Sequence, residues 1–246
     1  MHIDRHPINV RTHAGGTQQV YLDYFPDECP VCHSIGEIKR DYAEGYMHPS
    51  TGQYAGRFVQ VIYRCPRTTC GSHFIIQYEA YRNDRGNGYQ EYYFRERTFP
   101  RIPKPLKISE RVSALSPDFV RISNQANEAD THSLNEITGI GYRKALEFLI
   151  KDYCIHKKPD DKASIRSALL MACINDYVTD TNIKECARRA TWLGNDETHY
   201  ERRWNEHDIE DLKVLIDLTK NWIDNELLTE HYIETMTTRN TPKRGG

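Results

Sequence analysis

The sequence predicts an α+β protein with a small β-rich domain followed by an all-α antiparallel helical bundle. β-branched and aromatic residues are concentrated before residue 100, and two closely spaced cysteine pairs lie in the same half. After residue 116, apolar residues recur at helical spacing instead. A length of 246 residues is sufficient for two domains, each with its own core.

The composition is that of an ordinary globular protein, with 38% hydrophobic and 28% charged residues. The net charge of −2 argues against a dedicated polyanion binder, but the charge is unevenly distributed. The segment 57–107 holds ten Lys and Arg against four acids, an excess of six positive charges, while the rest has an excess of eight negative charges. With no membrane-length apolar run and no signal-peptide core, we expect a cytoplasmic protein without membrane contact.

In the first half, residues 1–20 are polar and rich in His and Gly, and we expect a flexible N-terminal arm there. A β domain is expected over 21–100. Its strands are predicted at "RFVQVIYR" (57–64), "HFIIQYEAYR" (73–82) and "GYQEYYFRERTF" (88–99), with a hairpin turn at "NDRGNG" (83–88). Three strands form a thin sheet that needs a further staple.

Four cysteines supply that staple. Cys29 and Cys32 lie in "CPVCHS", and Cys65 and Cys70 lie in "CPRTTCGS". Each pair has Pro after its first Cys, and Gly71 follows the last, as in tight knuckles whose amides point at thiolate sulfurs. The pattern predicts a zinc ribbon with one structural Zn²⁺ ion, because four thiolates leave no open position on the metal.

Two alternatives remain open for these cysteines. They could form disulfides or stay free thiols, although a cytoplasmic location disfavours disulfides. The second spacing, C-x4-C, is also longer than usual, so His33 or His73 could replace one cysteine as ligand.

The basic segment contains many aromatic residues, a mixture that contacts phosphates while stacking on bases. Alternatively, the tyrosines cover the sheet and the arginines form its solvated face. Candidate nucleic-acid-binding residues are Arg82, Arg85, Tyr92, Arg95 and Arg97.

A Pro-rich linker is expected over 101–115, since "PRIPKPLK" (100–107) is incompatible with helix. The helical bundle is expected over 116–236, opening with a Ser N-cap and Pro in "SPDF", and a disordered tail over 237–246. Helices are predicted near 117–131, 134–156, 161–178, 181–200 and 207–236. The last of them has a clear apolar face, formed by Ile209, Leu212, Ile216, Thr219, Ile223 and Leu227.

Two motifs in this half carry polar residues at helical spacing. In "GIGYRKALEFLIKDY" (139–153), Arg143 and Glu147 are four apart and can pair along one helix face. In "TWLGNDETHY" (191–200), Gly194 precedes Asn195 and His199, also four apart. A partly buried Arg143 could reach Asn195 or His199.

With these motifs, residues 117–225 resemble the domain-of-unknown-function family 4145. That family is grouped with the HEPN domains, helical bundles found in bacterial toxins, CRISPR nucleases and phage-defence proteins. An N-terminal zinc ribbon before such a domain also resembles members of the family. The resemblance implies a HEPN-like fold and a homodimer formed through the helical domain.

Active HEPN ribonucleases use an Arg a few residues from a His, without a metal. Here His199 matches the His, but no Arg stands at the matching place; the nearest are Arg188 and Arg189 before it and Arg202 and Arg203 after it. We therefore favour a packing role, in which Gly194 permits close helix approach, Asn195 bonds a backbone carbonyl and His199 lies inside. The alternatives are catalysis by these residues, or noncatalytic ligand or nucleotide binding in the same pocket.

The expected function is a noncatalytic or regulatory module, in which the ribbon binds nucleic acid or protein and the bundle dimerises or contacts an effector protein. Its setting in bacterial defence, anti-phage or restriction-associated, follows from the resemblance alone. One alternative is a metal-independent endoribonuclease with His199 as acid or base, Asn195 positioning it, and Arg188 or Arg202 on phosphate. Another is a pure protein-interaction adaptor.

Overall fold

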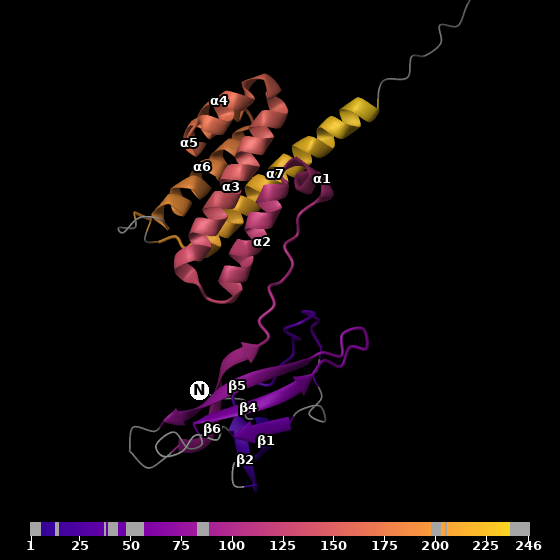
Figure 1. Ribbon diagram of the computed structural model, residues 1–246, viewed down its shortest axis with the longest axis vertical. Coiled ribbons are helices and arrows are strands. Elements are labelled where there is room, and N and C mark those ends of the chain that lie inside the picture. Colours follow the sequence, from indigo (N-terminus) through magenta and orange to yellow (C-terminus); the bar gives the residue numbers. More distant parts are fainter. Residues whose placement is uncertain are drawn as a thin grey trace, which may run out of the picture. The chain divides into compact units, whose positions relative to one another are not determined.

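The computed structural model consists of two compact units, Met1–Lys104 and Pro105–Gly246 (Figure 1). Together they form an α+β protein, with strands in the first unit and helices in the second. The structure describes residues 6–12, 15–36, 38, 44–47, 57–82, 89–197, 203–204 and 206–236. The expected turn over 83–88 and tail over 237–246 lie outside these ranges.

The first unit is a small β-barrel. Its strands are β1 (His6–Arg11), β2 (Thr17–Leu22), β3 (Glu44–Met47), β4 (Phe58–Arg64), β5 (His73–Arg82) and β6 (Tyr89–Phe99). They are hydrogen-bonded in the order β1-β2-β6-β5-β4-β3, and a parallel pairing of β1 with β3 closes the barrel. β2 also pairs in parallel with β6, and the other neighbours are antiparallel.

The predicted strands over 57–64, 73–82 and 88–99 are confirmed as β4, β5 and β6. The expected flexible arm over 1–20 is wrong for residues 6–11 and 17–20, because these belong to β1 and β2. Their backbone groups pair with β3, β6 and each other, which holds the segment in place.

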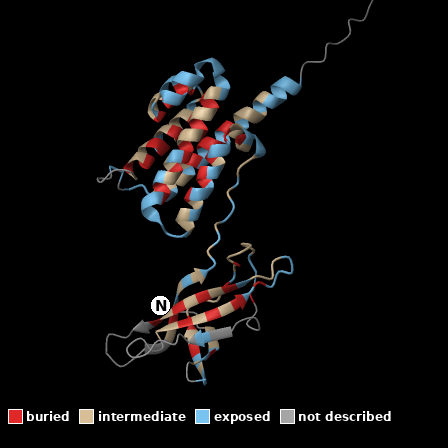
Figure 2. Cartoon of the chain, viewed as in Figure 1, coloured by how far each residue is buried: buried red, intermediate tan, exposed pale blue. Residues whose placement is uncertain are grey.

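The barrel has an apolar interior. In β4, Val59, Val61 and Tyr63 are buried while their neighbours are more exposed, as a period of two requires. The hydroxyls of Tyr63 and Tyr78 lie 2.8 Å apart, and Tyr78 also donates to the carbonyl of Tyr24 at 3.1 Å. The unit therefore has a core of its own, whereas the sequence predicted a thin three-stranded sheet that depends on a staple (Figure 2).

The expected linker over 101–115 contains the boundary between the units, at Lys104 and Pro105. Residues 101–109 form neither helix nor strand. However, α1 (Glu110–Leu115) begins within the expected linker, and its Val112 is fully buried in the helical core. The helical unit thus starts earlier than residue 116.

The second unit contains α1, α2 (Pro117–Thr131), α3 (Asn135–Lys157), a 3-10 turn (Pro159–Asp161), α4 (Lys162–Ser167), α5 (Leu170–Tyr177), α6 (Thr181–Asp196) and α7 (Ile209–Thr235). The predicted helices near 117–131, 134–156, 181–200 and 207–236 are confirmed as α2, α3, α6 and α7; α6 ends earlier than predicted, and α7 is slightly shorter at both ends. The helix predicted over 161–178 is instead two, because Ala168 and Leu169 adopt extended backbone.

Side chains at helix starts explain several boundaries. Ser109 accepts from the Val112 N–H, and Asp180 accepts from the Ile183 N–H at 2.8 Å. Asp208 begins α7 with a capping box. Ser116 precedes Pro117 as predicted, but its hydroxyl makes no cap; it donates to Asp152 on α3 at 2.5 Å.

The helical core lies between α2, α3, α6 and α7 (Figure 2). The predicted face of α7 is buried at Leu212, Ile216, Thr219 and Ile223.

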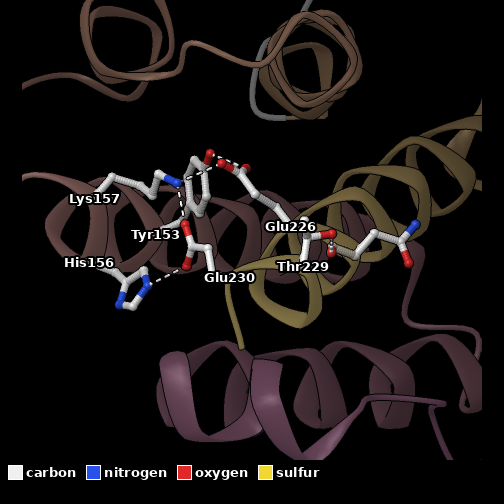
Figure 3. A network of polar contacts seen from close by, with 7 residues as sticks. Tyr153, His156, Lys157, Glu226, Thr229 and Glu230 are labelled. Atoms are coloured by element: carbon white, nitrogen blue, oxygen red, sulfur yellow. Dashed lines mark hydrogen bonds and ion pairs between the residues drawn. The ribbon is translucent and has the colours of Figure 1, made fainter. Parts of the chain in front are cut away.

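At the edge of this core, to which Tyr153 belongs, a polar network joins α3 to α7 (Figure 3). The Tyr153 hydroxyl donates to Glu226 at 2.5 Å, and Lys157 binds both Glu226 and Glu230. His156 Nε2 lies 3.1 Å from Glu230. Side chains of α3 and α7 are thus joined by charge as well as by apolar packing.

Candidate functional site

The four predicted cysteine ligands meet at one end of the barrel unit. Cys29 and Cys32 follow β2, and Cys65 and Cys70 occupy the connection from β4 to β5. Their sulfur atoms all lie within 4.8 Å of one another, as metal ligands must. All four are free thiols, so the disulfide alternative is not what the structure contains.

The sulfur geometry fits a tetrahedral metal ion. Zinc–sulfur bonds of about 2.3 Å place tetrahedral thiolates about 3.8 Å apart. Cys32 Sγ and Cys65 Sγ are separated by 3.8 Å, across the two cysteine pairs. Soft thiolate sets of this kind select zinc, iron–sulfur centres or Cu(I) over hard cations. The residues present therefore fit a four-thiolate metal site.

The two cysteine pairs form matching knuckles. In the first, the His33 N–H donates to the Cys29 carbonyl at 2.8 Å; in the second, the Gly71 N–H donates to the Arg67 carbonyl at 2.8 Å. His33 and Gly71, each directly after a cysteine, have φ of 54° and 57°. The left-handed backbone favours glycine, and this explains why the second motif has Gly71 at that point.

A backbone N–H two residues after each cysteine points at its sulfur. The donors are Val31, Ser34, Arg67 and Ser72, for Cys29, Cys32, Cys65 and Cys70 respectively. The Val31 N–H lies 3.4 Å from Cys29 Sγ. Such bonds stabilise thiolate, the form of cysteine that binds metal.

The first and second cysteines of the knuckles differ in environment. Cys29 and Cys65 are 1% and 3% exposed, and burial raises the pKa of both thiols, that of Cys65 to about 12. At Cys32 the hydroxyl and backbone of Ser34 lower the thiol pKa to about 6, and at Cys70 those of Ser72 lower it as well. Each knuckle thus pairs an inner sulfur with an outer one.

Sequence reasoning missed the residues that support these outer sulfurs. Ser34 and Ser72 each stand two residues after the second cysteine, and the repeated C-x-S in "CHS" and "CGS" was the available signal. Arg67 Nη1 donates to Ser34 Oγ at 2.7 Å, which joins the two knuckles. These side chains hold the outer sulfurs in position.

Neither histidine alternative joins the sulfur group. His33 Nδ1 lies 3.1 Å from Glu28, which also binds Lys104. His73 is an exposed residue at the start of β5, opposite Arg64. Among the residues described, the potential metal ligands that come together are the four cysteines.

The second group of predicted residues meets between α3 and α6. Arg143 Nε donates to Asn195 Oδ1 at 3.2 Å, and Arg143 Nη1 lies 3.3 Å from Glu147. Lys151 extends this row, 2.8 Å from Glu147. Asn195 thus accepts a hydrogen bond from the arginine side chain.

Two glycines permit this close approach. A Cβ on Gly194 would lie 2.7 Å from Arg143 Cδ and 2.9 Å from its Cβ. On α3, a Cβ on Gly139 would lie 2.4 Å from Glu197 Cγ. Gly194 on α6 therefore faces a side chain of α3, and Gly139 on α3 faces the side chain of Glu197, directly after α6. Gly139 was not among the residues predicted from sequence. With Arg143, Gly194 and Asn195 it forms the contact that we call the α3–α6 seam.

The buried Asp196, also missed, fixes the chain after α6. Its Oδ2 accepts from the N–H groups of Arg203 and Trp204 at 2.8 and 2.7 Å. Trp204 then stacks on Trp192, with ring centroids 5.8 Å apart and planes inclined by 6°. Asp196 thereby joins the end of α6 to the backbone of Arg203 and Trp204.

The structure does not bring Arg188 to Asn195. Arg188 lies on α6 seven residues earlier, about 10 Å along the axis, and pairs with Glu185 at 3.0 Å. His199 and Arg202, the other candidate catalytic residues, lie outside the described residues.

Three candidate nucleic-acid-binding residues are described on β6. Tyr92 stacks on Tyr21 of β2 with centroids 5.4 Å apart, and the guanidinium of Arg95 lies 4.2 Å from the centroid of Tyr24. Arg97 is exposed, with Nε 3.3 Å from Glu96. Arg85 and the side chain of Arg82 fall outside the described residues.

The fold and site together define an α+β protein with a four-cysteine candidate metal centre. Comparison of the chain with protein-family models, curated proteins and solved structures found no match. Within the described part of the chain, no helix has the length and apolar character needed to cross a membrane.

Proposed function

We propose that the chain is a noncatalytic nucleic-acid-binding protein whose barrel is stabilised by one structural zinc ion. The observation that carries the binding proposal is a strip of aromatic rings and a guanidinium along β2 and β6. Tyr21 and Tyr92 are stacked, and three residues further along each segment Arg95 covers the ring of Tyr24. Aromatic rings beside cationic groups are the means by which small β-barrels hold single-stranded nucleic acid.

The strip keeps its cation available to a ligand. Asp23 Oδ1 accepts from the backbone N–H of Arg95 at 2.8 Å, so it orients the strand at this point. The Arg95 side chain itself is exposed and lies on Tyr24. A phosphate can therefore reach this guanidinium while a base stacks on the neighbouring tyrosine pair.

Zinc is the metal that best suits the four-cysteine group. Closed four-thiolate sites with two knuckles are typical of structural zinc. Zn²⁺ is also redox-inactive, as suits an ion with a purely structural role. The group lies against the barrel core, since Cys29 and Cys65 are part of it. Bound there, the ion would hold together the chain before β3 and after β4.

The noncatalytic part of the proposal is supported by the α3–α6 seam. Arg143 donates a hydrogen bond to Asn195, and the Asp196 carboxylate accepts hydrogen bonds from two backbone N–H groups. These contacts give the motif a packing role. For the helical unit we propose, from its resemblance to HEPN-like domains, a role in dimerisation or effector contact within bacterial defence.

Binding is tested with fluorescein-labelled single-stranded RNA and DNA of about 20 nucleotides, longer than the roughly 4–16 that one small barrel covers. Fluorescence anisotropy is recorded over a salt series. Tyr92→Ala should weaken binding about fivefold or more through lost stacking. The double replacement of Arg95 and Arg97 by Ala should reduce the log–log salt slope by about 1.4, roughly 0.7 per lost phosphate contact.

The matched control is Arg121→Ala, which removes an exposed arginine from α2, paired there with Asp118. It should leave affinity unchanged. Absence of binding at low salt, or equal weakening by Arg121→Ala, rejects the nucleic-acid proposal and favours the adaptor alternative. RNA cleavage by the purified chain that His199→Ala abolishes would instead establish the endoribonuclease alternative.

A further inference from the structure

A pocket unrelated to the metal centre lies in the helical unit, between α2, α3, α7 and the chain before α1. Its volume is about 260 Å³. The apolar part of its wall comes from α2, α7 and the chain before α1: Leu106, Ile108, Phe119, Val214 and Ile216. Such a volume exceeds the roughly 150 Å³ that suffices for benzene in an apolar cavity, and falls just below drug-sized pockets of about 300 Å³.

Two hydroxyl groups are placed in this apolar wall. Ser123 is 2% exposed, and its Oγ has no hydrogen-bond partner among the described residues. Tyr142 is 4% exposed, and burial raises the pKa of its hydroxyl to about 12, so it stays protonated at neutral pH. A buried hydroxyl without a partner costs stability, and a ligand oxygen would satisfy it.

The charged residues of the pocket already bind one another. Lys213 Nζ lies 2.8 Å from both Asp130 and Glu210. Lys220 Nζ lies 2.7 Å from Asp217 and donates to the Lys107 carbonyl at 2.8 Å. Both ammonium groups are therefore neutralised by carboxylates, and an anionic ligand would have to compete with those carboxylates.

We propose that this pocket binds a small uncharged molecule: one ring, or an apolar group of similar size, that carries a single hydroxyl or carbonyl oxygen. The apolar wall takes the body of the ligand, and the Ser123 and Tyr142 hydroxyls bond its oxygen. The neutralised lysines exclude carboxylates of the same size. This site is independent of nucleic-acid binding by the barrel.

The test uses three probes of similar size, each with one fluorine: 4-fluorophenol, 4-fluorotoluene and 4-fluorobenzoate. Titration of the full chain is followed by ¹⁹F NMR line broadening and shift. 4-Fluorophenol should bind saturably and more tightly than 4-fluorotoluene, and 4-fluorobenzoate should bind weakest. No saturable binding of 4-fluorophenol, or tighter binding of 4-fluorobenzoate, would overturn the proposal.

Two conservative variants assign the binding to this pocket. Ser123→Ala and Tyr142→Phe should each weaken 4-fluorophenol about fivefold, as expected for one lost hydrogen bond, and leave 4-fluorotoluene unchanged. The matched controls are Ser167→Ala and Tyr232→Phe, at exposed positions of the same unit. If the controls weaken 4-fluorophenol as much as the pocket variants, the pocket is not the site.

Discussion

The side chain of Arg143 on α3 lies directly over Gly194 on α6, in space that a Cβ at position 194 would need. From there the guanidinium reaches Asn195 and Glu147. A conformationally costly glycine within a helix is explained by this contact.

Gly194→Ala should therefore destabilise the helical unit. The added Cβ would lie 2.9 Å from Arg143 Cβ, which cannot rotate away. Overpacking of this kind costs about 1–3 kcal/mol, more than the roughly 1 kcal/mol that alanine gains in helix propensity. Urea unfolding followed at 222 nm measures the difference. In an Arg143→Ala background, the destabilisation by Gly194→Ala should be smaller, because Cγ and Cδ of residue 143 are gone. If the Gly194→Ala single variant is more stable than the parent, this packing role is refuted.

Removal of the metal should unfold the barrel unit and spare the helical one. Structural zinc contributes about 10 kcal/mol or more to a small site, far beyond the margin of a small domain. A strong chelator, or Cys29→Ser, should abolish the near-ultraviolet signal of the barrel tyrosines and leave the helical signal at 222 nm. Cys186→Ser is the matched control, since that cysteine lies on α6. Metal analysis should give one zinc per chain; iron or no metal would contradict the assignment.

Asp152 should make stability depend on pH in an unusual direction. Burial raises the pKa of this carboxyl above its ordinary 3.8, although the Ser116 hydroxyl bonded to it opposes the shift. An acid with a raised folded pKa stabilises below its unfolded pKa, and this stability is lost as the pH rises through the folded pKa. Asp152→Asn should thus raise the Tm at neutral pH, and the gain should vanish toward pH ~3. Asp160→Asn, at an exposed position, should show no such gain; a lower Tm at neutral pH for Asp152→Asn would count against this assignment.

Glu230, in the α3–α7 network, should show the opposite dependence (Figure 3). Burial alone would raise its pKa, but Lys157 and His156 outweigh this and hold the pKa below the ordinary 4.5. Its stabilising effect is present above pH ~4.5 and is lost as the pH falls through the folded pKa. Glu230→Gln should lower the Tm at neutral pH but not in acid, whereas Glu234→Gln, one turn on, should have little effect. Equal Tm changes in the two variants would argue against the network.

Regions with a strong local pattern were predicted well. β4 to β6 are dense in β-branched and aromatic residues, and α7 repeats its apolar face along most of its length. The four cysteines that come together could be predicted because a knuckle is a local structure with its own spacing. Asn195 and His199 were the two partners expected for a partly buried Arg143, and the contact with Asn195 is present.

Features that depend on distant partners could not be predicted in the same way. β1 contains a proline, β2 begins with three polar residues and β3 is a four-residue strand with a glycine, so their local sequence does not predict strands; their pairing in the barrel makes them strands. The break between α4 and α5 contains neither Gly nor Pro, so no residue there predicts a helix end. Asp196 and Gly139 acquire their roles from residues that the fold brings to them.

A metal ion bound by the two knuckles would give the barrel unit a reversible cross-link. Cys32 and Cys65 are 33 residues apart, so a bound ion closes a loop that contains β3 and β4. In the chain-entropy relation used for disulfides, closing a loop of this length disfavours the unfolded state by about 4 kcal/mol. Unlike a disulfide, this closure requires no oxidant and opens when the ion leaves. The availability of the metal, and not the redox state of the surroundings, would then set how long the barrel stays closed.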